Sequence, residues 1–525
     1  MRPKAAPDPA ALGRRHFVNR KRESLHRLSV QGATFDGLYQ LLGTPAWVRT
    51  ALDRILRNRG SKTPGVDGAT RDDFKAEWSK QALVDEVVRE MRSKSYQPSP
   101  IRRVYIPKPS DPSKQRPLGI ATLKDRVVQE AVRMILEPIY EPRFYPHSYG
   151  FRPFRSAHHA LARIHYLATA PRKYEWVVEG DIRDCFGSID HGILLRMMRQ
   201  TIHDRPLLHV MQEMLKAGVL DGLAYHEPEG GSPQGSVVSP LWANIYLTAL
   251  DRFVAAKYAS QEVNLRRREA ARGQTVPCDI VRYADDFVIM VRGSQQDAER
   301  IKADVARFLQ EELHMDLSLE KTLVTHITDG FDFLGYEMRA VDHGSKRVVF
   351  TRPSKKSKER FRAKVRDMLR RMICMPREAA LIASLNRLVR GWCLYFAHGS
   401  SASTFRGLER WLTRLVSKAL YKKHRGRHYR SRKLHHREFW IPFRFSIRDE
   451  TRWHNGAGLG VWLDVRRTRA LHLWRPSHTR IVYTHQFGRY DAYDPADRAL
   501  LLSRRMANRQ RGRTERLGPK RQSQG

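Results

Sequence analysis

The spacing of apolar residues predicts that helices and short strands alternate over most of the chain. Helices are indicated where apolar positions recur three and four residues apart, and strands where they alternate or form short runs. On this basis we expect helices near residues 35–59, 70–91, 123–136, 239–253 and 298–312, and strands near residues 101–108, 114–120, 175–181 and 280–291. Thr70 and Asp73 resemble a capping box at the start of the second of these helices.

The pattern changes between Lys355 and Lys423, where it predicts three basic amphipathic helices. The residues expected to face inward are Phe361, Val365, Met368 and Leu369, then Leu381, Leu385, Leu388, Trp392 and Phe396, and finally Leu408, Trp411, Leu412 and Leu415. A purely structural bundle would show the same apolar stripes, but it would not need so one-sided a charge on its outer faces.

The two ends of the chain lack a clear periodicity. Residues 1–34 are basic and rich in Pro and Ala, which predicts a flexible arm. Scattered tryptophans in residues 426–503 indicate a small folded unit. Residues 504–525 are basic and poor in apolar side chains, which predicts a disordered tail.

A stretch near the middle of the chain places two acids inside an apolar run, Ile-Val-Arg-Tyr-Ala-Asp-Asp-Phe-Val-Ile-Met-Val at residues 280–291. It predicts two short buried strands that meet in a tight turn, with Asp285 and Asp286 at the tip. Adjacent anions beside an apolar core repel each other and lose hydration, so a cation would stabilise them. For an isolated Asp-Asp pair, an ordinary solvated turn is the simpler alternative.

The net charge points to a polyanionic partner. Among 525 residues there are 96 Lys and Arg against 55 Asp and Glu, a net charge of +41. Nucleic acid is favoured, through neutralisation of its phosphates. An anionic membrane surface competes with it, but no apolar run of about 20 residues predicts a transmembrane span and no apolar segment near the start predicts a signal peptide. The four cysteines form no C-x-x-C pair, which indicates a reducing compartment such as the cytoplasm.

A third acid ends another predicted strand, at Asp181. Phosphoryl transfer with two metal ions needs carboxylates from separate elements, so that cations about 3.5–4 Å apart activate the attacking hydroxyl and hold the leaving phosphate. Asp181 together with Asp285 and Asp286 would meet that requirement. Asp184 and Asp190 lie beyond the strand, where helix capping or a surface turn explains them better.

Polar residues elsewhere suit contacts with a nucleotide. Lys108 and Arg116 belong to a predicted hairpin and suit a triphosphate, although charges on a hairpin edge also serve to keep it solvated. Gln234 lies in a glycine-flanked turn, where it could approach a base pair or sugar or simply precede the next helix. Lys321, in a short segment after the predicted helix at residues 298–312, is a further candidate.

Several short motifs follow one another over roughly residues 60–420. They are Thr63-Pro-Gly-Val-Asp-Gly68, Arg116-Pro-Leu-Gly119, Ser148-Tyr-Gly-Phe-Arg-Pro153, Gly180-Asp-Ile182, Ser232-Pro-Gln-Gly235, Tyr283-Ala-Asp-Asp286, Glu320-Lys-Thr322 and Phe333-Leu-Gly-Tyr336. Each alone would be weak evidence, but in this order they resemble the motifs of group II intron-encoded reverse transcriptases with maturase activity. The resemblance implies an α+β right-hand polymerase, with fingers and palm over residues 35–350, a helical thumb or maturase X domain over 351–425 and a DNA- or RNA-binding region over 426–503.

The same resemblance implies roles for the candidate residues. Asp181, Asp285, Asp286 and the Ile182 carbonyl would hold two Mg²⁺ ions, with Lys321 near the departing pyrophosphate. The residues implied to contact substrate or primer are Lys108 and Arg116 on the dNTP, Gln234 beside the nascent base pair, and Phe333, Leu334, Gly335 and Tyr336 supporting the primer end.

Phe186 matches the aromatic residue that packs under the deoxyribose in this family and leaves no room for a 2′-hydroxyl. Simple core packing is the alternative for this residue.

The implied partners are an RNA template, a DNA primer, group II intron RNA and target DNA, with no membrane. Many members of the family end in an HNH-type endonuclease with paired cysteines. Because no cysteine follows Cys393, we expect no such domain here, and we expect priming from an existing 3′ end.

Three other functions are compatible with parts of this pattern. A non-catalytic RNA-splicing chaperone would keep the fold but would not need the acid trio. A domesticated or defence-associated reverse transcriptase would lack the intron partner. An RNA-dependent RNA polymerase typically carries an acid where this chain has Phe186.

Overall fold

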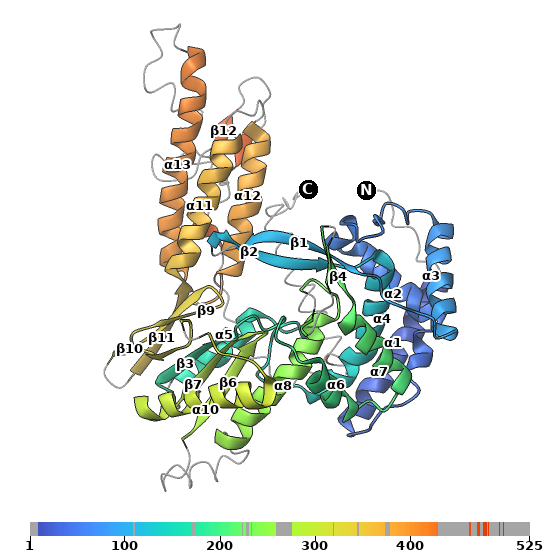
Figure 1. Cartoon of the computed structure of the whole chain (residues 1–525). Helices are drawn as coiled ribbons and strands as arrows, with labels where there is room; N and C mark the ends of the chain where they lie inside the picture. Colours follow the sequence, from blue (N-terminus) through green and yellow to red (C-terminus); the bar gives the residue numbers. More distant parts are fainter. Residues whose placement is uncertain are drawn as a thin grey trace, which may run out of the picture. The chain divides into compact units, whose positions relative to one another are not determined.

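The computed structural model describes residues 9–108, 111–169, 172, 174–222, 224–226, 230–232, 234–258, 276–318, 320–343, 346–372, 378–428, 461–463, 470–472, 476–479, 481, 493 and 497. The chain divides into two compact units. The first contains Met1–Ala160, Val178–Val324 and Phe487–Gly525, and the second contains Leu161–Val177 and Thr325–Gln486. Figure 1 labels the helices and strands of both units.

Helix α4 (Leu123–Tyr140) forms the centre of the helical part of the first unit, and almost all of its side chains are buried. Thr122 caps its N-terminus by accepting a hydrogen bond from the Asp125 amide at 3.1 Å. Helices α1 (Pro9–Val30), α2 (Pro45–Arg57) and α3 (Glu77–Arg92) pack against it (Figure 1). The fully buried Trp47 of α2 donates from Nε1 to the carbonyl of Ala131, at 3.0 Å.

Helix α1 corrects the expectation of a flexible arm over residues 1–34. Val18 and Leu25 are buried, but polar side chains are buried on the same helix. Arg22 forms an ion pair with Glu137 of α4, and the Ser29 hydroxyl donates to a main-chain carbonyl of α4 at 2.5 Å. The prediction was wrong because this helix is anchored largely through polar contacts, which a search for apolar periodicity does not detect.

The structure also corrects two predicted helix boundaries. The segment at residues 35–59 is interrupted: a 3₁₀ turn, η1 (Tyr39–Leu41), precedes α2, and η2 (Arg59–Lys62) follows it. Pro45 is the first residue of α2 and keeps Thr44 extended, at φ −98° and ψ 117°. The Thr70 amide does donate to Asp73, at 2.8 Å, but the pair closes a turn, and α3 begins only at Glu77.

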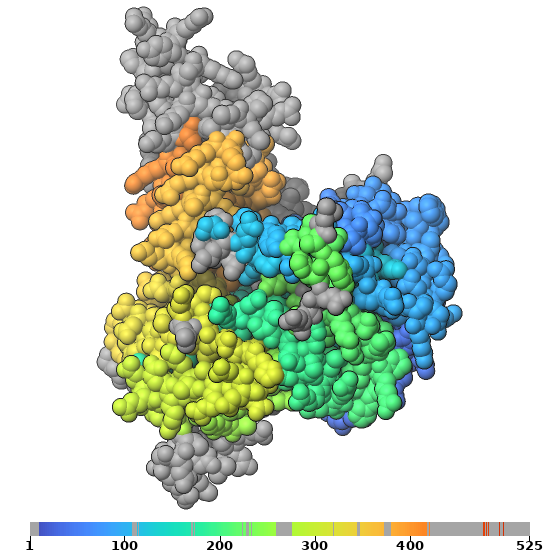
Figure 2. All heavy atoms as spheres, in the orientation of Figure 1, coloured from blue at the N-terminus to red at the C-terminus, as the bar shows by residue number. Residues whose placement is uncertain are grey.

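A four-stranded sheet contains the predicted basic hairpin. Its strands are β1 (Ile101–Lys108), β2 (Asp111–Ile120), β4 (Val219–Asp221) and β5 (Ala224–His226), in the order β2-β1-β4-β5. β1 and β2 are antiparallel, whereas β1 and β4 are parallel. In Figure 2 the light-blue atoms of β1 and β2 lie on the visible face beside the green atoms of β4 and β5.

A second four-stranded sheet carries the predicted acids, in the order β6-β7-β3-β8. Its strands are β3 (Trp176–Asp181), β6 (Cys278–Tyr283), β7 (Asp286–Val291) and β8 (Leu323–His326). The boundary between the units passes through β3 and β8. Helix α8 (Ser239–Tyr258) packs against β6, and α10 (Gln295–Leu313) packs against α8 (Figure 1).

Two aspartates begin helices in this region, as the sequence predicts for Asp190. Asp190 accepts from the Ile193 amide at 2.8 Å and caps α6 (His191–Arg199). Asp204 accepts from the Leu207 amide at 2.9 Å and caps α7 (Arg205–Lys216). A 3₁₀ turn, η3 (Glu141–Arg143), follows α4.

The second unit combines a three-stranded sheet with three basic helices. The sheet order is β11-β10-β9, for β9 (Phe331–Phe333), β10 (Tyr336–His343) and β11 (Lys346–Pro353). Helices α11 (Lys355–Met372), α12 (Glu378–Tyr395) and α13 (Ala402–His428) follow, which confirms the three predicted helices. Their apolar faces meet around Trp392, whose ring centroid lies 4.8 Å from that of Phe361 and 4.5 Å from that of Phe396. Helix α5 (Ala157–Ala168) crosses the boundary between the units.

Short elements follow α13 in the described part of the chain: β12 (Val461–Leu463), β13 (Ala470–His472) and η5 (Pro476–His478). Most of the unit expected over residues 426–503, and all of the tail expected over 504–525, lie outside the described residues. Of the helices that the structure describes, none has the length and apolar character needed to cross a membrane.

Truncating one buried leucine of α12 should destabilise the protein much more than truncating an exposed one. Leu385 is fully buried, whereas Leu394 on the same helix is 42% exposed. We expect Leu385→Ala to lower the free energy of unfolding by about 2–5 kcal/mol, through lost burial and the cavity left behind. Leu394→Ala should change it by less than about 0.5 kcal/mol. Urea unfolding of the two full-length variants measures the difference, and equal losses would contradict the described packing.

Candidate active site

The hairpin β6–β7 presents two adjacent aspartates at its tip, as the sequence predicts. Tyr283 pairs with Asp286, so Ala284 and Asp285 form the turn. Ala284 has φ +61°, in the left-handed region that disfavours residues with a Cβ atom. Such a backbone costs about 1–3 kcal/mol and persists only where its surroundings enforce it. The chain therefore holds the two acids in a strained turn.

Asp181 lies on the neighbouring strand and on the same face as Asp286. A Cβ atom at Gly180 would lie only 2.1 Å from the ring of Phe287, so these two residues face each other across β3 and β7. Successive side chains of a strand point to opposite faces. Asp181 follows Gly180 and Asp286 precedes Phe287. The side chains of Asp181 and Asp286 therefore both lie on the opposite face of the sheet.

The three carboxylates repel one another. Partial burial, followed by the charges of Asp285 and Asp181, raises the pKa of Asp286 to about 6, while Lys321 acts against the increase. Burial and Asp181 also raise the pKa of Asp285, while Arg116 and Lys321 act against that increase. The structure thus brings together the acids that the sequence singles out and surrounds them with two of the predicted cations.

Lys321 neutralises part of this charge directly. Its ammonium group donates to Oδ2 of Asp181 at 2.5 Å. The main chain reinforces the contact, because the Ser318 amide donates to the carbonyl of Asp181 at 2.8 Å. Ile182 forms an antiparallel bridge with Leu317 in which the hydrogen bonds come from the flanking residues. The carbonyl of Ile182 therefore points away from that neighbour.

The donor atoms of this cluster suit a hard divalent cation. Carboxylate and main-chain oxygens are the ligands that Mg²⁺ prefers, and the raised pKa of Asp286 reflects negative charge that a cation would relieve. Over the described ranges, no three His, Cys, Asp or Glu side chains already stand in a metal-binding arrangement. The Asp181 carboxylate is engaged by Lys321 instead.

The predicted triphosphate ligands occupy different parts of the β1–β2 hairpin. Arg116 is exposed, pairs with Ile106 and interacts electrostatically with Asp285. Lys108 pairs with Asp111 beyond an irregularity in the register. The side chain of Lys108 lies outside the described residues. The structure therefore brings Arg116 toward the acids and leaves the position of the Lys108 ammonium group open.

The loop that carries Gln234 packs on both the β1–β2 hairpin and the segment after Asp181. The carbonyl of Gln234 accepts from the Gly119 amide at 2.6 Å, and its Nε2 contacts Asp184 Oδ1 at 3.4 Å. A Cβ atom at Gly235 would lie 2.7 Å from the Gly119 carbonyl oxygen, which explains the glycine. Asp184, for which the sequence predicts helix capping or a surface turn, thus also contacts a candidate substrate-binding residue.

Phe186 lies beside the same loop. The Phe186 carbonyl accepts from the Ser232 amide at 2.7 Å, and its side chain is only partly buried. A purely structural core residue would be expected to be buried completely. Phe186 therefore retains some solvent exposure.

Comparison with known proteins identifies the family to which these elements belong. A family model described as reverse transcriptase (RNA-dependent DNA polymerase) matches residues 106–338, and a model of the group II intron maturase-specific domain matches residues 358–440. Protein YkfC of Escherichia coli is 36% identical over 340 residues, which cover 61% of this chain and 88% of YkfC. This chain belongs to the group II intron-encoded reverse transcriptase family.

Two other members extend the comparison. The group II intron-encoded protein LtrA of Lactococcus lactis is 36% identical over 355 residues, which cover 59% of this chain and 58% of LtrA. The mitochondrial nuclear intron maturase 2 of Arabidopsis thaliana is 29% identical over 275 residues, which cover 41% of this chain and 37% of that protein. The chain therefore matches a little more than half the length of LtrA.

The motif Phe333-Leu-Gly-Tyr336 forms a tight hairpin turn in the second unit. Phe333 pairs with Tyr336, and both central residues, Leu334 and Gly335, have positive φ, at +50° and +80°. Tyr336 is fully buried and donates to the carbonyl of Tyr395, at 2.5 Å. Tyr395 in turn donates from its hydroxyl to the carbonyl of Leu334, at 2.9 Å. The turn is thus fixed to α12.

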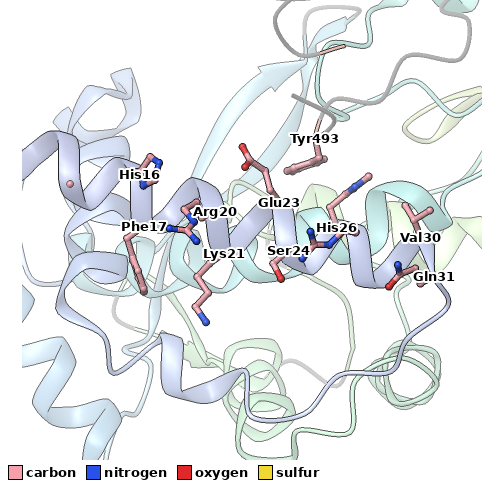
Figure 3. A pocket seen from close by; sticks show the side chains of 12 residues that line it. His16, Phe17, Arg20, Lys21, Glu23, Ser24, His26, Val30, Gln31 and Tyr493 are labelled. Carbon is pink, nitrogen blue, oxygen red and sulfur yellow. The ribbon is translucent and has the colours of Figure 1, made fainter. Parts of the chain in front are cut away.

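A hollow of about 860 Å³ with a largely basic lining runs along α1. Figure 3 shows its lining, which is dominated by side chains of α1. The residues are Gly13, His16, Phe17, Arg20, Lys21, Glu23, Ser24, His26, Arg27, Val30, Gln31 and Tyr493. Sequence analysis missed this surface because it treated the segment as unstructured.

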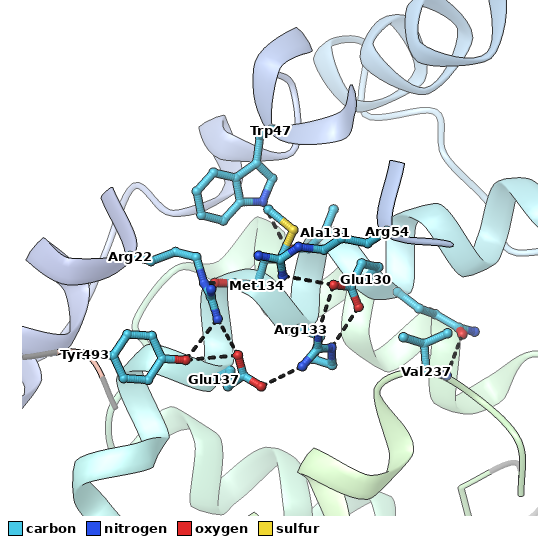
Figure 4. Close-up of polar contacts among 11 residues, drawn as sticks. Arg22, Trp47, Arg54, Glu130, Ala131, Arg133, Met134, Glu137, Val237 and Tyr493 are labelled. Carbon is cyan, nitrogen blue, oxygen red and sulfur yellow. Dashed lines mark hydrogen bonds and ion pairs between the residues drawn. The ribbon is translucent and has the colours of Figure 1, made fainter. Parts of the chain in front are cut away.

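Tyr493 connects the distant C-terminal part of the chain to α1 and α4. Its hydroxyl donates to Glu137 at 2.9 Å and accepts from Arg22 at 2.9 Å, and its ring stacks on His26 at 4.8 Å between centroids. Figure 4 shows the hydrogen bonds of Tyr493 with Glu137 and Arg22 together with the ion pairs around Arg133. No sequence signal marked Tyr493, because the contact depends on residues more than 350 positions away.

The raised pKa of Asp286 predicts a stability change that depends on pH. Its pKa rises from 3.8 to about 6 on folding, so folded protein binds this proton more tightly and loses stability as pH increases from about 4 to 6. Asp286→Asn should remove that loss. We expect metal-free variant protein to gain up to about 1 kcal/mol above pH 6, since the exposed carboxylate is screened by solvent.

Thermal unfolding in EDTA between pH 4 and 8 measures this gain, which should vanish toward pH 4. Asp85→Asn, at an exposed position of α3, provides the control and should show no such pH dependence. A difference between Asp286→Asn and the unmodified protein that stays constant over the whole pH range would contradict the assigned repulsion.

Proposed function

We propose that this chain is an RNA-directed DNA polymerase that also binds group II intron RNA and promotes its splicing and retrohoming. The observation that carries the catalytic part is the convergence of Asp181 with the Asp285–Asp286 turn, on one face of a sheet and beside Lys321. The cluster does not serve stability. The pKa of Asp286 is raised there, and the backbone of Ala284 is strained, and both features are costs to the folded state.

Asp181, Asp285, Asp286 and the Ile182 carbonyl would hold two Mg²⁺ ions in this function. Bound there, the ions would lower the pKa of the primer 3′-hydroxyl and stabilise charge on the transferred phosphate. Lys321 is close enough to Asp181 to exchange its carboxylate partner for the pyrophosphate of the departing group. Arg116, whose charge acts on Asp285, would bind the triphosphate of the incoming dNTP.

The substrate-facing residues give the reaction its selectivity in this proposal. Phe186 would exclude a 2′-hydroxyl, and Gln234 would lie beside the nascent base pair, on a loop whose main chain is hydrogen-bonded to Gly119. Lys108 would add a second positive charge to the dNTP site. The hairpin at residues 333–336 would support the primer end.

Binding of intron RNA follows from charge and family. The outer face of α11 carries exposed basic side chains, namely Lys355, Lys356, Arg360, Lys364, Arg366 and Arg370. All of this helix from residue 358 onward lies within the match to the maturase-specific domain. Neutralisation of RNA phosphates would give such a face affinity that falls steeply with salt, and the basic hollow along α1 would enlarge the contact. DNA targets and RNA templates would use the same type of contact.

Substitution of one turn aspartate decides whether this protein is an enzyme. We expect Asp285→Ala to lower the rate of dNTP addition to a DNA primer on an RNA template by at least about 10²–10³-fold, because the site loses a group that stabilises the transition state. Asp85→Asn should retain full activity. A non-catalytic splicing chaperone would show no extension with any of these proteins, and unchanged extension by Asp285→Ala would remove the assigned site.

Removal of the Phe186 ring should relax the choice of sugar. We expect Phe186→Ala to raise incorporation of ribonucleotides relative to deoxyribonucleotides by about 10- to 200-fold, the range that a change in pocket volume supports. Trp78→Ala removes an exposed aromatic side chain of α3 and should leave the ratio unchanged. Competition between rNTP and dNTP in single-nucleotide extension measures it. Continued strong exclusion of ribonucleotides by Phe186→Ala would refute the assignment.

A further inference from the structure

An arginine lies inside the buried strand that leads into the Ala284–Asp285 turn. Arg282 of β6 is completely buried between apolar neighbours. Its guanidinium group donates from Nε to Oδ1 of Asp251 at 2.8 Å and from Nη2 to Oδ2 at 2.6 Å. Asp251, on α8, is also completely buried. The two side chains form a bidentate ion pair without solvent contact.

The third nitrogen of Arg282 reaches the turn itself. Nη1 donates to the carbonyl of Ala284 at 2.9 Å and to Oδ1 of Asn244 at 3.0 Å. Ala284 is the residue with the left-handed backbone, immediately before Asp285. One planar group therefore links the strained turn to two residues of α8.

A second support touches the turn from the loop at residues 147–150. The Arg282 amide donates to the carbonyl of His147 at 3.0 Å, and the Tyr149 amide donates to the carbonyl of Arg282 at 2.8 Å. Asn244 donates from Nδ2 to the carbonyl of Gly150 at 2.8 Å. A Cβ atom at Gly150 would lie 2.3 Å from the amide nitrogen of Ala284, so the loop backbone is in contact with the turn.

Stability alone does not explain a buried ion pair at this position. Well-packed apolar residues of similar volume often stabilise a fold as well as, or better than, a buried ion pair. The two residues of β6 that precede Arg282, Ile280 and Val281, are apolar. The pair supplies what apolar residues cannot, which is a directed hydrogen bond to the carbonyl of Ala284. Fixing that carbonyl restricts the direction in which the next side chain, Asp285, leaves the turn.

We propose that Arg282, oriented by Asp251 and Asn244, is a positioning residue that holds Asp285 and Asp286 in the geometry needed to bind divalent metal ions. The inference rests on the proposed catalytic role of these two acids. It predicts that loss of the Arg282–Ala284 contact increases the mobility of the turn, weakens metal binding and slows nucleotide addition, without a matching loss of global stability.

A double substitution, Arg282→Met with Asp251→Leu, separates positioning from stability because it removes both charges and keeps similar volumes. We expect a thermal midpoint close to that of the unmodified protein. The apparent Kd for Mn²⁺, measured by electron paramagnetic resonance, should rise about 10- to 100-fold, and kcat for primer extension should fall by a similar factor, with little change in KM for dNTP. Hydrogen exchange of the peptide at residues 283–287 should become faster in metal-free protein.

A buried ion pair remote from the turn provides the matched control. Glu137→Gln weakens the Arg22 and Arg133 contacts of α4. It should lower the thermal midpoint and leave Mn²⁺ affinity and exchange at residues 283–287 unchanged. If the double variant of Arg282 and Asp251 matches the unmodified protein in Mn²⁺ affinity, in kcat and in exchange at residues 283–287, the positioning role is wrong.

A second variant answers the question if the double variant does not fold. Arg282→Lys keeps a positive charge beside Asp251, but its ammonium group lacks the planar fork that reaches Asp251, Asn244 and Ala284 together. Unchanged Mn²⁺ affinity and exchange in Arg282→Lys would overturn the proposal. Primer extension by Asp285→Ala, measured alongside, tests the catalytic role separately. If Asp285→Ala remains active, the proposed function is refuted. If Asp285→Ala is inactive but the Arg282 variants behave like the unmodified protein, only the positioning role is refuted.

Discussion

Repulsion among three carboxylates is the constraint on which this protein depends. Asp181, Asp285 and Asp286 come from two neighbouring strands and a strained turn, and burial together with their mutual charge raises the pKa of Asp286. Positive charge from Lys321 and Arg116 compensates only part of it. A fold selected for stability alone would separate such groups. Keeping them together requires a rigid frame, and much of the first unit can be understood as that frame.

The frame is built from close main-chain contacts and buried polar groups. Gly180 lets the ring of Phe287 pack against its strand, and Gly150 lets a loop touch the amide of Ala284. Arg282 crosses from β6 to α8, where Asp251 and Asn244 bind its guanidinium group. These contacts resist the strain of the turn, because moving the turn would break the buried hydrogen bond from Arg282 to the carbonyl of Ala284.

Charge elsewhere is arranged differently, on surfaces rather than in the core. The basic side chains of α11 are exposed, and those of α1 line an open hollow. Surface charge of one sign attracts a polyanion over long distances and adds little to folding. The molecule therefore combines a few buried ion pairs that fix geometry with many exposed cations that favour nucleic acid, in agreement with its membership of the group II intron-encoded reverse transcriptase family.

The sequence by itself determined many of the local elements and singled out the acids. Alternating apolar runs predicted β6 and β7 with Asp285 and Asp286 at the turn, and helical spacing predicted α11, α12 and α13, because these features depend on neighbours in the chain. Only the tertiary structure decided that α1 is an ordered helix, that Tyr493 joins it, and that Arg282 reaches Asp251. Those contacts pair polar groups far apart in sequence, and no local period records which distant partner satisfies a buried charge.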